Sequence, residues 1–367
     1  MKSSNRFARI VFLLIIPLAL SGAAGCSTTT VSEAPVIGVD YSVVRVLYAT
    51  DRNKTESTKP DEVYGGRRGE LSYGYCDVSI PRDHRMGELE SPRGLLDFFF
   101  PEDPSKHVML LEVTPDEKEN FYANLGARVR ASDKDSAFLF VHGFNTTFED
   151  AARRTAQMSY DLTFDGASVF YSWPSEGKAT AYTVDEQNVA WAEANLRNFF
   201  EEFVTRSEAE NIYVIAHSMG NRAVTRALSS FMAERPDLKS RIKEVILTAP
   251  DIDADVFKRD IAPQLIAAGQ PITLYSSSND LALTASRKIH GYPRAGDSGK
   301  GIVVLPGIET VDATGMDTGF LGHSYFAETR SVLADLYGLI NEGRRPEERF
   351  GLREVESPAG SFWAFKK

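Results

Sequence analysis

The sequence predicts an α/β fold in which a doubly wound, mostly parallel β-sheet is flanked by helices. Three observations predict it. Short apolar segments rich in Val, Ile and Leu recur along the chain, helical periodicity fills the gaps between them, and most of the apolar segments are continuous rather than alternating. Continuous apolar strands are typical of a parallel sheet that is covered on both faces. Strand–helix alternation from residue 137 onward indicates a doubly wound sheet.

The expected strands are residues 44–52, 73–81, 107–113, 137–143, 168–173, 211–217, 244–249, 272–277 and 302–308. Three helical faces are expected from Phe148, Ala151, Ala152 and Thr155, from Ala192, Leu196, Phe199, Phe200 and Phe203, and from Val224, Ala227, Leu228 and Phe231. Thr146 and Glu149 form a capping-box pattern at the start of the first of these helices. The chain before residue 137 has more strand and less helix, so it is expected to supply an antiparallel edge.

Composition and charge bound the function classes. The 367 residues are 43% hydrophobic and 25% charged, as expected of one globular domain. Removing residues 1–25 takes three positive charges and no negative ones from a formal net charge of −10, which leaves −13. A body this acidic argues against nucleic acid as a partner.

The N-terminus has the composition of a secretory signal peptide. Lys2, Arg6 and Arg9 precede an apolar run at residues 10–20, and small residues follow. The run is shorter than the roughly 20 residues that a membrane-spanning helix needs. We therefore expect residues 1–25 to be a signal peptide, with an uncut membrane anchor as the alternative.

The small residues before Cys26, followed by a polar stretch, resemble the lipobox of bacterial lipoproteins, in which the cysteine becomes the lipidated N-terminal residue. Ala23 departs from that pattern, since a leucine is commoner there, so cleavage after Gly25 and secretion to the periplasm remain the alternative. The expected organisation is a lipidated-Cys tether at residues 26–42, an α/β domain at 43–341 and a C-terminal tail at 342–367. The other cysteine, Cys76, is expected to be a buried apolar residue in a strand.

Ser218 is the candidate nucleophile. The apolar strand at residues 211–217 runs into the segment AHSMG, residues 216–220, and an amphipathic helix follows. A serine on such a tight strand-to-helix turn presents its hydroxyl forward, with small residues two positions before and after it. The positive end of the helix dipole favours developing negative charge there. The alternative is a serine that only caps an ordinary helix.

A second turn supplies a candidate oxyanion donor. An apolar strand ends in His142-Gly143-Phe144-Asn145, before the first capped helix. This is where an α/β hydrolase places one of its two oxyanion N–H groups. We expect the backbone N–H groups of Phe144 and Met219 to hold the oxyanion of a tetrahedral intermediate. The alternative is a glycine turn with a structural histidine.

The general base is chosen by elimination. This fold orders its triad as Ser, then Asp or Glu, then His, and only His290 and His323 follow Ser218. His323 comes after the last expected strand of the domain and just before a helix, so it is preferred to His290.

The acid has two candidates. Asp280 follows the expected strand at residues 272–277 and suits a histidine that arrives one strand later. Asp251, after the previous strand, is the reserve, with helix capping as its alternative role. The acidic run from Asp251 resembles the start of a calcium loop, but Val256 and Ala262 stand where a glycine and a glutamate are needed. We expect no metal and no cofactor.

Five motifs together resemble a bacterial α/β-hydrolase family of unknown function, often labelled esterase/lipase superfamily. They are VLYATDRN at residues 46–53, HGFN at 142–145, YSWP at 171–174, AHSMGN at 216–221 and APDID at 249–253. The resemblance covers residues 44–339, nearly the whole body after the tether. It implies the α/β-hydrolase fold and a serine-hydrolase mechanism, with no settled substrate.

The expected function is a serine hydrolase, of the carboxylesterase or lipase kind, that cleaves an acyl ester through Ser218, His323 and Asp280. Its expected partners are a small acyl-ester or lipid substrate and a membrane that holds the lipid anchor, on the periplasmic side of the bacterial cell envelope. Trp173 is expected to line the substrate pocket or to pack beside its strand. A catalytically silent envelope lipoprotein that uses the fold as a binding scaffold is the alternative. The sequence leaves acyl chain length, ester against thioester or peptide bond, and oligomeric state open.

Overall fold

A computed structural model describes residues 40–91, 102–315 and 326–366, all of them within one structural unit that spans residues 37–367. The strands are β1 Tyr41–Lys54, β2 Tyr64–Pro81, β3 Met109–Asp116, β4 Ser136–Val141, β5 Ala167–Ser172, β6 Asn211–His217, β7 Ile242–Thr248, β8 Ile272–Ser276, β9 Glu309–Asp312, β10 Leu352–Ser357 and β11 Gly360–Phe365. The helices are α1 Lys118–Arg130, α2 Phe148–Asp161, α3 Tyr182–Arg206, α4 Gly220–Glu234, α5 Ala254–Val256, α6 Ala262–Ala268, α7 Leu281–His290 and α8 Phe326–Ile340.

The strands form one sheet in the order β10-β11-β9-β8-β7-β6-β4-β5-β1-β2-β3. The strands from β11 to β1 in this order all pair in parallel. The pairs at the two edges, β10 with β11, β1 with β2, and β2 with β3, are antiparallel. The predicted fold class is confirmed, and so is the antiparallel edge that the chain before residue 137 supplies. The carboxyl ends of the parallel strands lie along the same edge of the sheet, and this is where α/β proteins place their ligand-binding and active sites.

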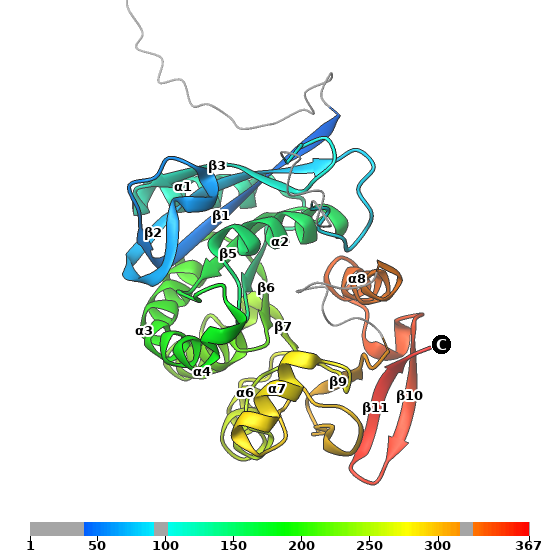
Figure 1. Cartoon of the computed structure of the whole chain (residues 1–367). Coiled ribbons are helices and arrows are strands. Elements are labelled where there is room, and N and C mark those ends of the chain that lie inside the picture. The colour runs from blue at the N-terminus through cyan, green and yellow to red at the C-terminus, as the bar shows by residue number, and fades with distance from the viewer. Residues whose placement is uncertain (1–39, 92–101, 316–325, 367) are drawn as a thin grey trace, which may run out of the picture. The chain divides into compact units, whose positions relative to one another are not determined.

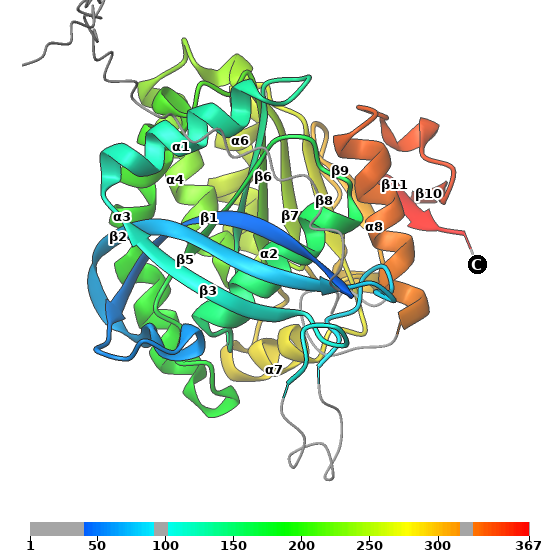
Figure 2. The same ribbon diagram turned by 90° about the horizontal axis from the view of Figure 1, so that it is seen from above.

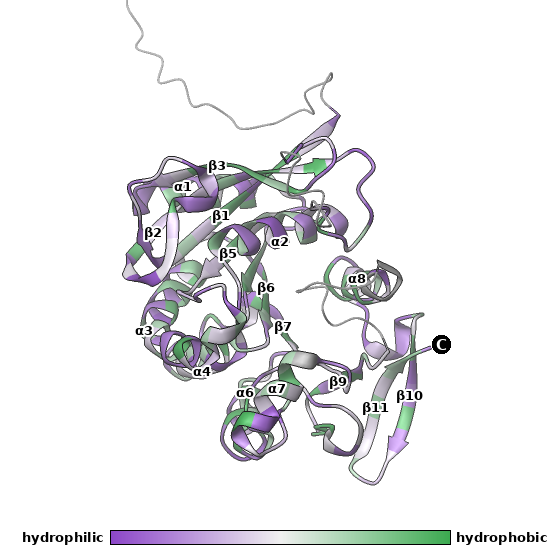
Figure 3. Ribbon diagram, viewed as in Figure 1, coloured by the Kyte–Doolittle hydropathy of each residue, from purple (hydrophilic) through white to green (hydrophobic). Residues whose placement is uncertain are grey.

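Helices cover both faces of the sheet. One apolar core lies under α1, α3, α4 and α6, and a second lies under α2 and α8. Figure 1 shows α3 and α4 on one side of the central strands and α2 and α8 on the other. In the view from above, β1, β2 and β3 run next to one another in front of the other strands (Figure 2). Apolar residues follow the central strands and the inner sides of the helices (Figure 3). The three predicted helical faces are buried as expected.

Cys76 lies in β2 and is fully buried, as predicted. The capping box lies one residue later than predicted. Thr147 accepts the Asp150 N–H, and Asp150 accepts the Thr147 N–H. Thr146 is excluded from capping because its own N–H and carbonyl bind groups outside the helix.

The strand predicted at residues 302–308 is wrong. Pro306 has no N–H to donate to a sheet, and Gly307 adopts a φ of 92°, so a turn replaces the strand. Sheet pairing begins only at β9.

The expected C-terminal tail needs correction as well. Residues 352–365 form the hairpin β10–β11, and β11 pairs in parallel with β9 through Trp363 and Val311. Within the described ranges, no helix combines the length and apolar character needed to cross a membrane.

Candidate active site

Ser218 occupies the turn between β6 and α4 in a strained backbone conformation. Its φ is 47°, a left-handed value that costs a residue other than glycine roughly 1–3 kcal/mol. Hydrogen bonds hold it there. The Ser218 N–H donates to the Thr248 carbonyl at 2.9 Å, and the Ser218 carbonyl accepts the Asp251 N–H at 3.2 Å and the Asn221 side-chain amide at 3.0 Å. The strained turn is therefore fixed by the neighbouring strand β7 and by the first turn of α4.

Two glycines bring the β4 turn directly against this serine. A Cβ on Gly220 would lie 2.3 Å from the His142 carbonyl oxygen, and one on Gly143 would lie 2.9 Å from the Ser218 Cβ. Both distances are too short for any side chain. The turn after β4 and the turn after β6 thus pack backbone against backbone.

The amide N–H groups of Phe144 and Met219 lie in these two turns. Within the described residues, neither N–H donates to a protein acceptor. Met219 is buried, and Phe144 is partly buried with its ring edge-on to Tyr182 at a centroid distance of 5.2 Å. Two unsatisfied N–H groups beside a serine, at the N-terminus of a helix, suit an oxyanion.

His142 is a neutral, structural histidine. Burial, together with the positive charge of Arg52, holds its pKa well below the ordinary value. Its Nδ1–H donates to the Gly143 carbonyl at 2.8 Å, so Nε2 is the acceptor that faces the Ser172 hydroxyl at 3.2 Å. His142 therefore holds the turn and does not act as a base.

Trp173 packs behind this turn. Of the two expected places for it, the substrate pocket or a position beside its strand, the structure shows the second. Trp173 is 1% exposed, stacks on His142 at 4.9 Å, and donates its indole N–H to the His142 carbonyl at 2.8 Å. Its large side chain and its single donor are both used in supporting the turn.

His217 and His290 are the other two described histidines near the site, and His217 directly precedes Ser218. Burial, and the charge of Arg154, lower the pKa of His217 to about 3. His290 donates from Nδ1 to the Ser286 carbonyl at 2.8 Å and faces Glu186 Oε1 with Nε2 at 2.8 Å. His323, the predicted base, follows β9 in sequence and lies outside the described residues.

Asp280 caps helix α7, directly after β8. Its Oδ1 accepts the Leu283 N–H at 2.9 Å. Within the part of the chain that the structure describes, no side-chain donor binds this carboxylate. Burial, with the nearby charges of Asp251 and Asp297, raises its pKa.

Asp251 is enclosed by partners. One carboxylate oxygen accepts from Ser286 at 2.5 Å and Arg294 at 2.8 Å, and the other accepts from Tyr182 at 2.6 Å and Arg222 at 3.1 Å. Burial opposes ionisation here, but the two guanidinium charges prevail and hold the Asp251 pKa below its ordinary value. Sequence reasoning missed these partners, which come from α3, α4, α7 and the following loop.

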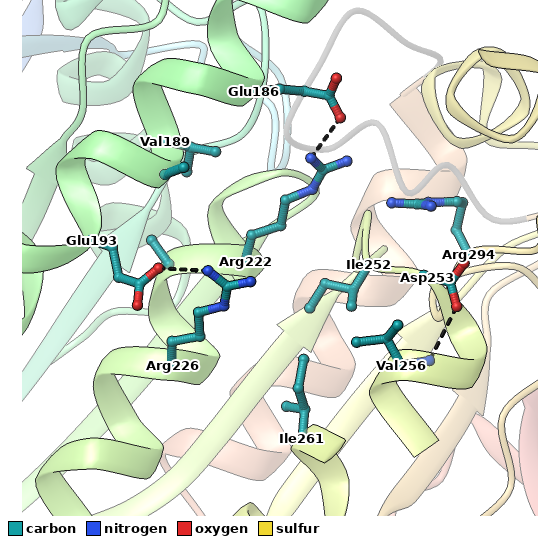
Figure 4. A pocket seen from close by; sticks show the side chains of 12 residues that line it. Glu186, Val189, Glu193, Arg222, Arg226, Ile252, Asp253, Val256, Ile261 and Arg294 are labelled. Atoms are coloured by element: carbon teal, nitrogen blue, oxygen red, sulfur yellow. Dashed lines mark hydrogen bonds and ion pairs between the residues drawn. The ribbon is translucent and has the colours of Figure 1, made fainter. Parts of the chain in front are cut away.

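A separate pocket of about 230 Å³ lies between α3, α4 and the chain around α5 (Figure 4). Ion pairs line it, Arg222 with Glu186 at 2.7 Å and Arg226 with Glu193 at 2.8 Å. Neither Ser218 nor Asp280 lines this pocket.

Asp253, from the acidic run after β7, accepts the N–H groups of Asp255 and Val256 as the cap of α5. Among the described residues, no cluster of three or more His, Cys, Asp or Glu is arranged to hold a metal ion.

Fold and turn together define an α/β protein with a serine on the tight turn between a central strand and a helix, the architecture of the α/β hydrolases. The chain belongs to the family described as "Alpha/beta hydrolase of unknown function (DUF900)", which it matches over residues 117–340. No curated protein matches the sequence.

Solved structures resemble the chain only distantly. The esterase domain of a Rhodothermus marinus protein is 13% identical, with 82% of this chain and 98% of that chain covered and a TM-score of 0.36. A fungal esterase from Rhizomucor miehei is 11% identical, with 82% and 84% covered and a TM-score of 0.35. Esterase B of Lactobacillus rhamnosis is 9% identical, with 81% and 88% covered and a TM-score of 0.32. Similarity at this level does not extend to activity or substrate.

Proposed function

We propose that this protein is a serine hydrolase that cleaves an acyl ester through an acyl-enzyme intermediate. In this proposal Ser218 is the nucleophile, His323 the general base, and Asp280 the carboxylate that orients His323. The backbone N–H groups of Phe144 and Met219 hold the oxyanion.

The chemical steps follow from these roles. Ser218 loses its proton to His323 as its oxygen attacks the acyl carbonyl, and a tetrahedral oxyanion forms. The oxyanion collapses, the ester C–O bond breaks, and His323 returns the proton to the departing alcohol. Water, deprotonated by the same histidine, then attacks the acyl-enzyme and releases the acid and free Ser218.

One observation carries the proposal: the Phe144 and Met219 N–H groups, which have no acceptor among the described residues, lie in closely packed turns beside the strained Ser218. A serine that merely capped a helix would need neither a left-handed φ nor a second turn packed against it. Strain of this kind persists where surrounding structure enforces it, and it is concentrated at functional sites. This favours an enzyme over a silent binding scaffold.

The choice of Asp280 rests on the contrast with Asp251. Both oxygens of Asp251 already accept hydrogen bonds from side chains, two of them arginines. Among the residues that the structure describes, Asp280 accepts from backbone N–H groups alone, and it keeps acceptor capacity for an imidazole N–H.

The experiment is covalent labelling with a fluorophosphonate probe, together with hydrolysis of p-nitrophenyl esters of increasing chain length. Both use the chain from residue 43 onward, without the expected signal peptide and tether. Ser218→Ala should abolish labelling and lower kcat by at least about 10³-fold. Ser229→Ala, on the same helix α4, is the matched control and should keep both. A wild-type protein that takes no label, or a Ser218→Ala variant with full turnover, would refute the proposal. The chain-length series distinguishes an esterase from a lipase.

We also propose that residues 1–25 are removed on export and that Cys26 carries the lipid that anchors the protein to a membrane on the periplasmic side. Growth with radiolabelled palmitate should label the wild-type chain, and Cys26→Ser should abolish the label. A Cys26→Ser protein that stays in the membrane fraction would support the uncut anchor instead.

A further inference from the structure

Arg52 is a buried cation on β1, beside the turn that carries Phe144. It is 1% exposed. Its guanidinium donates to the Ser172 hydroxyl at 2.7 Å, the carbonyls of Ser175 at 2.8 Å, Thr146 at 2.7 Å and Gly65 at 3.2 Å, and faces His142 Nε2 at 3.4 Å.

No carboxylate among the described residues forms an ion pair with this guanidinium. Burial lowers the pKa of Arg52, to about 10, and the side chain therefore remains charged at neutral pH. Removing an arginine from water is expensive unless polar groups replace the water, and here neutral acceptors do so. Packing alone would not demand a charged residue at this position.

Two of the groups that Arg52 contacts lie at the two ends of the turn that carries Phe144. His142 lies two residues before Phe144 and Thr146 two residues after it, and the same guanidinium Nη2 faces both. A second link supports the turn from the same side, because the Thr146 N–H donates to the Ser175 hydroxyl at 3.1 Å and that hydroxyl donates to Asp185 at 2.6 Å. Side chains outside the turn thus hold it in place, while the Phe144 N–H has no acceptor among the described residues.

We propose that Arg52 is a positioning residue of the oxyanion hole, which fixes the Phe144 N–H by binding both ends of the turn at residues 142–146. This inference rests on the serine-hydrolase function proposed above. The planar fork of arginine can reach several acceptors in fixed directions, which the single ammonium of a lysine cannot do.

The experiment compares Arg52→Lys and Arg52→Met with the wild type, and normalises kcat to the number of sites that a fluorophosphonate titrates. A displacement of about 1 Å at a catalytic group can cost about 100-fold, so we expect kcat per site to fall about 10–100-fold while KM changes less than about 3-fold. A trifluoromethyl ketone, whose adduct with the serine carries the oxyanion, should lose affinity by a similar factor.

Arg349→Lys is the matched control, since Arg349 is equally buried but binds Tyr275 and Asp335 far along the sheet. It should lower the melting temperature without changing kcat per site or inhibitor affinity. Ser175→Ala removes only the second link and should give a smaller loss in the same two quantities, which keeps the proposal testable if the Arg52 variants fold poorly.

The outcomes separate the two proposals. Wild-type protein that neither hydrolyses esters nor takes the label would refute the hydrolase itself. An active wild type, with unchanged kcat per site and inhibitor affinity in the Arg52 and Ser175 variants, would refute the role of Arg52 alone.

Discussion

Two buried charges lie on opposite sides of Ser218, and they are satisfied in different ways. Arg52, on the β1 side, binds mostly backbone carbonyls and no carboxylate among the residues described. Asp251, on the β7 side, binds the side chains of two arginines and two hydroxyl groups. The first charge fixes the path of a loop, and the second ties helices together.

The difference assigns separate tasks to the two sides. A charge that binds backbone carbonyls constrains main-chain geometry, so its loss should appear in catalysis. A carboxylate enclosed by guanidinium groups stabilises the fold, and its removal leaves buried cations unpaired. Substitutions on each side of Ser218 should separate these two tasks.

Asp280→Asn should give the largest change in turnover. An amide in place of the orienting carboxylate holds the imidazole in the wrong tautomer, which costs about 10⁴-fold in kcat in a Ser-His-Asp triad. We expect a loss of about 10³–10⁴-fold in p-nitrophenyl ester hydrolysis, with the melting temperature little changed. Retention of more than a tenth of wild-type kcat would remove Asp280 from the triad.

Asp251→Asn should change stability most. Breaking a buried ion pair typically costs about 3–5 kcal/mol, and here two arginines lose their partner. Urea unfolding should show a loss of this size, while kcat per titrated site stays within about tenfold of the wild type. Collapse of kcat per site with full stability would instead make Asp251 the acid.

The charge cluster around His84 should make stability depend on pH, in contrast to Arg52, which stays charged across the neutral range. Burial opposes protonation of His84, but hydrogen bonds to Asp161 at 3.0 Å and Glu90 at 2.8 Å prevail and raise its pKa to about 9. The folded state therefore binds the proton more tightly, and this stability is complete below about pH 6.5 and is lost as pH rises through about 9. The loss should be about 3 kcal/mol.

Urea unfolding between pH 6 and pH 10 checks this expectation. His84→Gln should flatten the profile over that range, because the neutral amide does not titrate. An equally steep decline in the variant would show that other groups cause it.

Trp173→Phe should have the smallest effect. It removes the hydrogen bond to the His142 carbonyl and keeps most of the stacking, so the expected loss of stability is about 1 kcal/mol. A few-fold drop in kcat should accompany it, because the same turn carries Phe144. If Trp173 instead contacted substrate, KM would rise while stability stayed constant.

Much of the fold was predictable because burial leaves a periodic signal in the sequence. The continuous strands around Ser218 and the apolar faces of α2, α3 and α4 were found from local pattern. The segment at residues 302–308 was mistaken for a strand because its apolar residues outweighed Pro306 and Gly307. The hairpin β10–β11 was missed since its charged, exposed residues carry no such periodic signal.

Local pattern in the sequence is enough to predict the strand–turn–helix setting of Ser218, the glycines that such close turns require, and the order of the candidate triad residues. The partners of the buried polar groups, in contrast, depend on the three-dimensional fold. Arg52 and Ser172, which form a hydrogen bond, are 120 residues apart in the chain, and Asp251 and Tyr182 are 69 residues apart. Local periodicity reports whether a residue is buried, but not what it contacts, because its contacts depend on how distant strands are ordered in the sheet.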